Sequence, residues 1–190
     1  AHPLPLKDEL LKYNTRGQDW KYTELIDAVK PLPPGRNYDV GKELFKVASC
    51  VACHRINNEG QQYGPDLTKL DEKKHNPEHL LLSLLEPSKE INKKFQTTVF
   101  LLDSGKTVTG LIVEETGTTV KVIINPLAKA APTVLQKSEI DARKTSPVST
   151  MPKGLANKLS REEILDLLAY VYARGDKKHK LFADGHKHKH

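Results

Sequence analysis

Sulfur-containing residues are scarce in this 190-residue chain, which has two cysteines, Cys50 and Cys53, and a single methionine, Met151. Two cysteines are too few for a four-cysteine zinc site. Long apolar runs are also missing: no stretch approaches the roughly 20 residues that cross a membrane, and the mean hydropathy is −0.54. With 37% hydrophobic residues, we expect a soluble chain with one main core and a smaller satellite core.

Both cysteines lie in one segment, Cys50-Val51-Ala52-Cys53-His54. The pattern C-x-x-C-H is typical of c-type haem attachment, because two thiols can add to the haem vinyl groups and the next histidine can bind the iron. A zinc site would need four ligands, and a redox dithiol would need a βαβ context that the flanking sequence does not offer. We therefore predict one covalent haem c, with His54 as the first axial ligand and no disulfide.

Met151 lies in a loop rich in proline, serine and threonine, just before a predicted helix. A histidine and a methionine are a standard axial pair in c-type cytochromes. The alternative is a surface methionine without a role. Because Met151 is the only thioether of the chain, we predict that it is the second axial ligand.

Three segments have the apolar periodicity and the end signals of helices: from Asp39 to the haem motif, from Asn76 to Glu86, and from Ser160 to Gly175. Asp39 and Asn76 are candidate N-caps, and Ser160 with Glu163 forms a capping box. A further apolar patch follows Trp20. We expect Trp20 to anchor the N-terminal extension on the main core rather than to relay electrons.

Residues 95–144 differ from the rest, because three runs rich in Val, Ile, Thr and Phe alternate with turn sequences. We predict strands over residues 95–102, 106–113 and 118–124, and a fourth near residues 133–135 with Ile140 after it. The segment has no His, Cys or Met. The strand pattern therefore predicts a small antiparallel sheet, which we expect to supply a partner surface. Without His, Cys or Met, this sheet should supply no iron ligand.

The haem motif, Gly64-Pro65-Asp66-Leu67, the Met151 loop and the flanking helices together resemble class I cytochrome c. The resemblance implies that Pro65 offers its carbonyl to His54 and that Leu67 packs on the haem. It also implies that a glycine and an aromatic residue of the first helix cross an aromatic residue of the last, which match Gly41, Phe45 and Tyr170. The expected fold is mainly α, a class I cytochrome c helical core with an inserted small antiparallel β module.

Including the β segment and Met151-Pro152-Lys153-Gly154-Leu155, residues 20–175 resemble the planctomycete-type haem-binding domain, which is often attached to larger dehydrogenase-like or propeller modules. We expect four parts, the second of them discontinuous. They are an N-terminal extension with a proline-rich connector (1–36), the cytochrome core (37–94 and 145–176), the β module (95–144) and a Lys/His-rich tail (177–190).

The net charge is +6 and the isoelectric point about 9.2. Five lysines and two aspartates in residues 176–190 account for +3 of it (5 − 2 = 3), and no basic nucleic-acid module is evident. We expect no nucleic acid and no membrane span, but redox partner proteins such as a dehydrogenase or a terminal acceptor, steered by a mildly cationic surface.

The first residue, Ala1, suits a chain whose signal peptide has been removed, and we expect a periplasmic or other extracytoplasmic location. The predicted function is single-electron transfer by a mono-haem cytochrome rather than catalysis. The alternatives are a haem-based sensor or binding module, a cytochrome subunit of a larger dehydrogenase, and a peroxidase-like enzyme, which would need a distal position free of Met151.

Overall fold

The structure, a computed structural model, describes residues 17–128 and 130–183. Predictions that fall on the first 16 residues and on the histidines at the end of the tail lie outside this part. The described residues contain four α-helices and a five-stranded sheet, with 34% of residues in helices and 24% in strands. The prediction of a mainly α fold is therefore wrong, because the sheet is larger than the sequence suggested.

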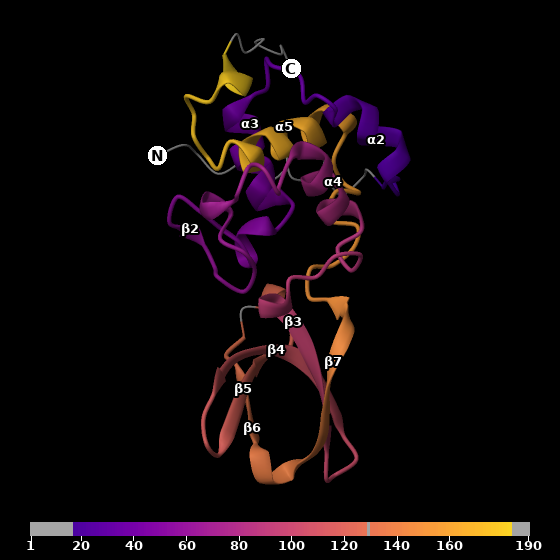
Figure 1. Cartoon of the computed structure of the whole chain (residues 1–190), viewed down its shortest axis with the longest axis vertical. Coiled ribbons are helices and arrows are strands. Elements are labelled where there is room, and N and C mark those ends of the chain that lie inside the picture. The colour runs from indigo at the N-terminus through magenta and orange to yellow at the C-terminus, as the bar shows by residue number, and fades with distance from the viewer. Residues whose placement is uncertain (1–16, 129, 184–190) are drawn as a thin grey trace. The chain divides into compact units, whose positions relative to one another are not determined.

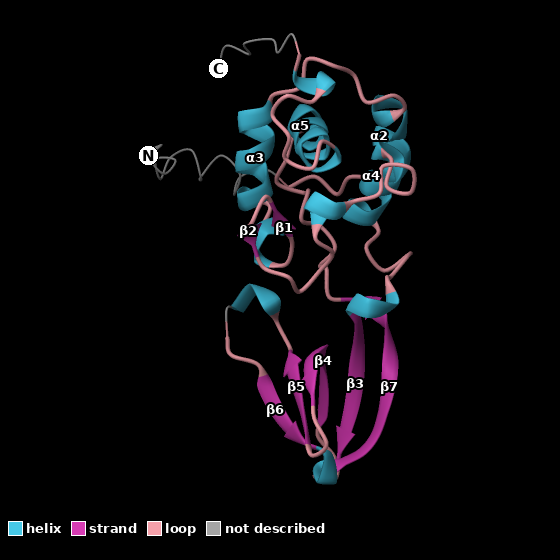
Figure 2. Ribbon diagram, turned by 60° about the vertical axis from the view of Figure 1, so that its left-hand side comes forward, coloured by secondary structure: helices cyan, strands magenta, loops and turns pink. Residues whose placement is uncertain are grey.

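The chain divides into two compact units. One comprises the described parts of residues 1–50, 67–86 and 153–190, and the other residues 51–66 and 87–152. The four parts expected from the sequence stay a prediction. The first unit holds all four helices (Figures 1 and 2): α2 (Tyr22–Val29), α3 (Tyr38–Val47), α4 (Pro77–Leu85) and α5 (Arg161–Tyr172). None of the described helices is long and apolar enough to span a bilayer.

Helices α3 and α5 cross at Gly41. A Cβ atom placed on Gly41 would lie 2.4 Å from the backbone oxygen of Asp166, so only glycine lets the two backbones approach this closely. One turn further along α3, the ring centroid of Phe45 is 5.8 Å from that of Tyr170. The contacts implied by the resemblance to class I cytochromes are thus present, and they fix how α3 packs on α5.

The ends of these helices follow the capping signals of the sequence. The Ser160 hydroxyl accepts from Glu163 N–H, and the Glu163 carboxylate accepts from Ser160 N–H, which confirms the predicted capping box. Asn76 caps α4 as predicted. The cap of α3 is Asn37, whose Oδ1 accepts from Val40 N–H at 3.1 Å, and not Asp39.

The N-terminal extension packs on the helical unit. Trp20 Nε1 donates to the backbone oxygen of Leu159 at 2.9 Å, which confirms its predicted anchoring role. Leu25 and Val29, four residues apart on α2, are almost fully buried. The part of the extension that follows residue 16 is therefore integral to this unit.

The second unit is built on an antiparallel sheet with the strand order β6-β5-β4-β3-β7 (Figure 2). Its strands are β3 (Gln96–Leu102), β4 (Thr107–Glu115), β5 (Thr119–Ile123), β6 (Thr133–Gln136) and β7 (Ile140–Ser149). Strands β3 to β6 confirm the predicted strands to within about two residues. Strand β7 was not predicted, and it raises the strand content most.

Strand β4 belongs to two parts of the sheet. Up to Gly110 it pairs with β3, and from Leu111 onward it pairs with β5. A Cβ atom on Gly110 would lie 2.8 Å from the backbone oxygen of Ile123, so glycine permits the close approach where the strand changes partner. The sheet curls there around a core of Phe100, Val120, Val122 and Leu135.

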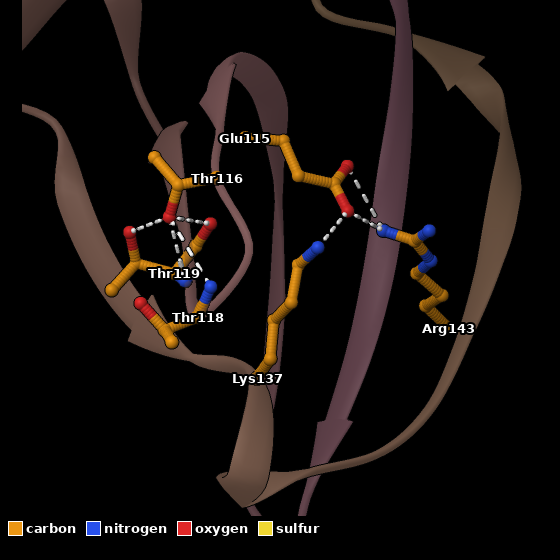
Figure 3. A network of polar contacts seen from close by, with 6 residues as sticks. All are labelled: Glu115, Thr116, Thr118, Thr119, Lys137 and Arg143. Carbon is orange, nitrogen blue, oxygen red and sulfur yellow. Dashed lines mark hydrogen bonds and ion pairs between the residues drawn. The ribbon is translucent and has the colours of Figure 1, made fainter.

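An ion-pair cluster joins β4 to β7 across the curl (Figure 3). Glu115 lies 3.0 Å from Arg143 Nη1 and 2.8 Å from Lys137 Nζ. Arg143 on β7 pairs with Phe100 on β3, and Phe100 in turn pairs with Val108 on β4. Val108 precedes Glu115 on the same strand by seven residues (115 − 108 = 7). Seven residues of flat strand would span roughly 23 Å. The pair can therefore form only because the sheet is curled.

The hydrogen bond from Lys137 is the main cause that lowers the pKa of Glu115 below its ordinary value of 4.5, and the hydrogen bond from Arg143 is the next. A carboxyl whose folded-state pKa is lowered contributes stability above its unfolded-state pKa and loses it as the pH falls through the folded-state pKa.

Glu115→Gln should therefore lower the thermal unfolding midpoint at pH 7 and low salt, and lower it less below pH 4 or at high salt. Because Glu115 is exposed to solvent, the effect should be small. Glu114→Gln is the control, since Glu114 pairs, among the described residues, with Lys121 on the neighbouring strand. Equal effects of the two substitutions at every pH would contradict a role in closing the curl.

Candidate functional site

The haem motif opens a tightly folded loop, residues 51–66. A short 3₁₀ turn covers Cys50–Ala52, and strands β1 (Arg55–Ile56) and β2 (Glu59–Gly60) form a hairpin directly after His54. The two turn residues, Asn57 and Asn58, have positive φ angles of 49° and 66°, as a two-residue hairpin turn requires. No hairpin was predicted here, although Asn57-Asn58 is a usable turn signal.

The hairpin packs against the backbone of His54. Gly60 has a φ of 105°, and a Cβ atom there would lie 2.1 Å from the backbone oxygen of His54. Nearby, Gln61 N–H donates to Val51 O at 3.1 Å and Gly64 N–H to Cys53 O at 2.9 Å. These bonds fold the loop back on the motif and fix where its histidine lies.

The imidazole of His54 is held on two sides. Its Nδ1 lies 3.0 Å from the backbone oxygen of Pro65, the contact that the family resemblance implies. A Cβ atom on Gly64 would lie 2.7 Å from Cε1 of the same ring, so the backbone at Gly64 passes directly beside it. With Nδ1 donating to a carbonyl, Nε2 is the nitrogen left to bind a metal.

Burial lowers the pKa of His54 below 6.5, although the bond to Pro65 acts in the opposite direction. The ring is therefore neutral at pH 7, which is the form that binds metals.

A second contact joins the two sides of the loop. Arg55 donates to the Asp66 carboxylate at 3.1 Å, and the backbones of the two residues form a bridge. Arg55 follows His54 in the chain and Asp66 follows Pro65, so this ion pair supports the His54–Pro65 contact. The sequence reading missed it, because nothing in the local sequence links residues 11 positions apart.

The two cysteines form no disulfide with each other. Cys50 is buried and Cys53 is partly buried, and burial raises the pKa of the Cys53 thiol above 9.0. Redox dithiols of the C-x-x-C type need a lowered thiol pKa. The environment of Cys53 thus disfavours the redox-dithiol alternative. Among the described residues, no three His, Cys, Asp or Glu side chains gather as a metal site, so the zinc alternative gains no support.

Met151 comes two residues after the end of β7 and is partly buried. Its N–H donates to Ser149 Oγ at 3.1 Å, and Ser149 N–H donates to Ser88 Oγ at 3.1 Å. Within the same unit, Thr97 Oγ1 donates to Val148 O at 3.1 Å. The approach to Met151 is therefore an anchored strand end, where the sequence had indicated a loop.

Among the site residues predicted from the sequence, His54 and Pro65 are in contact, as described. Leu67 is buried and starts a 3₁₀ turn, Leu67–Lys69. The pairing of Met151 with the iron stays a prediction.

A family model of cytochrome c matches residues 38–100. Residues 38–100 are thus similar to a cytochrome c domain. The matched segment covers α3, the haem motif, the loop to Leu67, α4 and the first five residues of β3. This cytochrome c domain implies covalently bound haem c and a part in electron transfer. A search of curated proteins found no match.

The residues of this cytochrome c domain fit a haem c. The two cysteines have the attachment spacing and form no disulfide, and one nitrogen of the histidine is engaged by a backbone carbonyl. Met151 and α5 lie outside the matched segment. Their roles therefore depend on the structure and on the sequence pattern, not on the match.

Proposed function

We propose that the chain is a mono-haem c-type cytochrome that carries single electrons between redox partner proteins. The observation that carries this proposal is the contact of His54 Nδ1 with Pro65 O at 3.0 Å, directly after the paired cysteines. Such a bond sets the tautomer and the direction of a metal-binding imidazole. One haem is expected, because the chain has one C-x-x-C-H motif and no further cysteine.

In this proposal Cys50 and Cys53 form the two thioethers, His54 binds the iron through Nε2, and Met151 is the second axial ligand. When bound, the haem supplies a one-electron iron couple whose potential a methionine ligand raises. Pro65 orients His54, and Leu67 excludes water from the haem. The segment between β7 and Met151 holds the thioether in place. A site with both axial positions filled by protein favours electron transfer over catalysis.

The location and the partners follow from the same chemistry. Haem is attached to c-type proteins outside the cytoplasm, so we propose a periplasmic or other extracytoplasmic location. The positive net charge favours acidic partner surfaces, such as those of a dehydrogenase or a terminal acceptor. The β-containing arrangement supports the narrower assignment to the planctomycete-type haem-binding domain, and with it a role as a subunit or module of a larger dehydrogenase.

Covalent attachment is the first test. Acid-acetone extraction should leave the haem on the polypeptide, and thiol titration of the denatured holoprotein should find no free thiol, because both are consumed. Cys50→Ala should weaken attachment, and His54→Ala should remove the proximal ligand. Ser49→Ala is the matched control, since it alters the residue before Cys50 without touching the motif. Extractable haem, or two titratable thiols in the holoprotein, would refute the proposal.

A further inference from the structure

The side chain of Arg55 joins two other parts of the loop that follows the haem motif. Its Nη2 donates to Asp66 Oδ2 at 3.1 Å. The amide oxygen of Gln62, in the orientation that satisfies both ends of this amide, accepts from Nη1 at 2.6 Å, from Nη2 at 2.7 Å and from Nε at 3.0 Å. A guanidinium presents several donors in fixed directions, so one side chain binds both partners. We call Arg55, Gln62 and Asp66 the Arg55 clamp.

The backbone of Arg55 is held as well as its side chain. Arg55 pairs with Gly60 across the β1–β2 hairpin, and its backbone also forms a bridge with Asp66. At Gly60 the backbone passes so close to the carbonyl oxygen of His54 that a Cβ atom has no room. The chain directly after His54 is therefore fixed from two sides.

The other end of the Arg55 clamp lies beside the partner of the His54 ring. Asp66 follows Pro65, whose backbone oxygen is 3.0 Å from His54 Nδ1. The side chains of Arg55 and Asp66 are only 30% and 18% exposed, so solvent screens their ion pair less than a pair on the open surface. The clamp thus ties the residue after the ring donor to the residue after its acceptor.

We propose that Arg55 is a positioning residue for the axial histidine: through the Arg55 clamp it keeps the His54 Nδ1–H on the Pro65 carbonyl and thereby sets the reduction potential of the iron. A ring N–H that donates to a carbonyl makes the imidazole a more basic ligand, and a more basic ligand favours ferric iron. Hydrogen bonding around the ligands is one of the protein's levers on haem potential. Loosening the clamp should therefore raise the potential.

This inference rests on the proposed function, since it concerns the histidine that would bind the iron. The opposite charges of the clamp make it possible to separate positioning from a direct charge effect. Arg55→Gln alone removes a positive charge, which by itself favours ferric iron and lowers the potential. Combining it with Asp66→Asn removes one charge of each sign, so the direct effects largely cancel. A higher potential in this double variant then reports a loosened histidine.

The first measurement is the exchange of the His54 Nδ1 proton with solvent, followed by NMR of the full-length ferrous holoprotein. Arg55→Gln and Asp66→Asn should each speed this exchange by at least about tenfold, because each breaks a hydrogen bond between charged groups. The double variant should exchange no more than about twofold faster than the faster single variant, because both substitutions remove the same interaction.

The second measurement is a potentiometric titration of the holoprotein. The double variant should shift the ferric–ferrous equilibrium toward the ferrous state by at least about threefold, or about 28 mV for one electron. A potential that is unchanged or lower in the double variant would contradict the proposed role of Arg55.

Arg143→Gln is the matched control, because it removes the same side chain from an ion pair with Glu115 in the sheet and should leave the exchange of the His54 proton unchanged. Gln62→Ala removes an exposed partner of Arg55 and serves if the ion-pair variants do not keep their haem. It should speed the exchange by about threefold, the loss of one ordinary hydrogen bond. Exchange as slow as in the native protein, in Arg55→Gln or in Gln62→Ala, would refute the inference.

Failure of the proposed function would look different. The ring protons of a histidine bound to ferrous haem iron are shifted strongly upfield by the haem ring current. A native holoprotein in which the His54 signals lack this shift would contradict both the proposed function and the role of Arg55. Shifted His54 signals with unchanged exchange and potential in the variants would contradict the role of Arg55 alone.

Discussion

Replacing Met151 with alanine should abolish the weak far-red band of iron–methionine ligation that we expect in the native ferric protein. It should also lower the reduction potential by on the order of 0.1 V, a part of the roughly 0.8 V range that axial ligands set, because a methionine ligand favours the reduced iron. The ferrous native protein should bind carbon monoxide poorly, whereas Met151→Ala should bind it readily. Absorption spectra and a potentiometric titration measure all three.

Val148→Ala is the control for this substitution. Its side chain is 60% exposed and precedes Met151 by three residues, so its removal should change none of these properties. If the native protein already binds carbon monoxide readily, or if Met151→Ala leaves the spectrum unchanged, Met151 is not the ligand. A haem-based sensor or an enzyme would then be the better interpretation, while the covalent attachment would be unaffected.

The second large effect is expected at Phe100, which is fully buried on the inner face of the sheet. Phe100→Ala should destabilise the protein by about 3–5 kcal/mol, the usual cost of emptying such a site. Strand β3 pairs with β7, and Thr97 and Ser88 hold the end of β7. The far-red band should therefore disappear at a lower denaturant concentration than in the native protein, while the haem stays covalently attached.

Leu101→Ala tests the same strand from its other face. Leu101 is 42% exposed, and its removal should cost no more than about 0.5 kcal/mol. Phe100→Leu keeps most of the buried volume and serves if the alanine variant does not fold. A far-red band that responds identically in the Phe100 and Leu101 variants would show that Met151 is held independently of the sheet.

Three of the four described α-helices, α3, α4 and α5, could be predicted because their ends are marked by short-range chemistry. Asn76 and Ser160 satisfy the first free N–H groups of α4 and α5, and each does so through the residue three positions later. The cap of α3 was misplaced by two residues, because Asn37 and Asp39 are both good capping residues. Which of them caps depends on where α3 meets α5, and that is a tertiary contact.

Strand β7 escaped prediction for a different reason. Its sequence contains Pro147 among serines and threonines, which indicates a loop when read alone. β7 is an edge strand, and an edge strand tolerates proline because one side of it needs no N–H donor. Whether a strand lies at an edge is settled by the whole sheet. The error carried over to the fold class and to the surroundings of Met151.

The residues of the candidate site also differ in whether local sequence or tertiary structure determines them. Cys50, Cys53 and His54 are recognisable because their chemistry requires a fixed local spacing. The His54–Pro65 contact could be expected only from the family resemblance. The Arg55–Asp66 pair had no local signal at all, since it depends on how the loop folds back.

The family match ends at residue 100, inside β3, and this has a practical consequence for anyone who expresses part of the chain. Both neighbours of β3 in the sheet, β4 and β7, lie beyond that residue. A fragment limited to residues 38–100 would end in a lone strand with two bare edges and an uncovered Phe100, a combination that promotes self-association. A soluble fragment should extend at least through Ser149 to close the sheet, and through Tyr172 to keep α5 on α3.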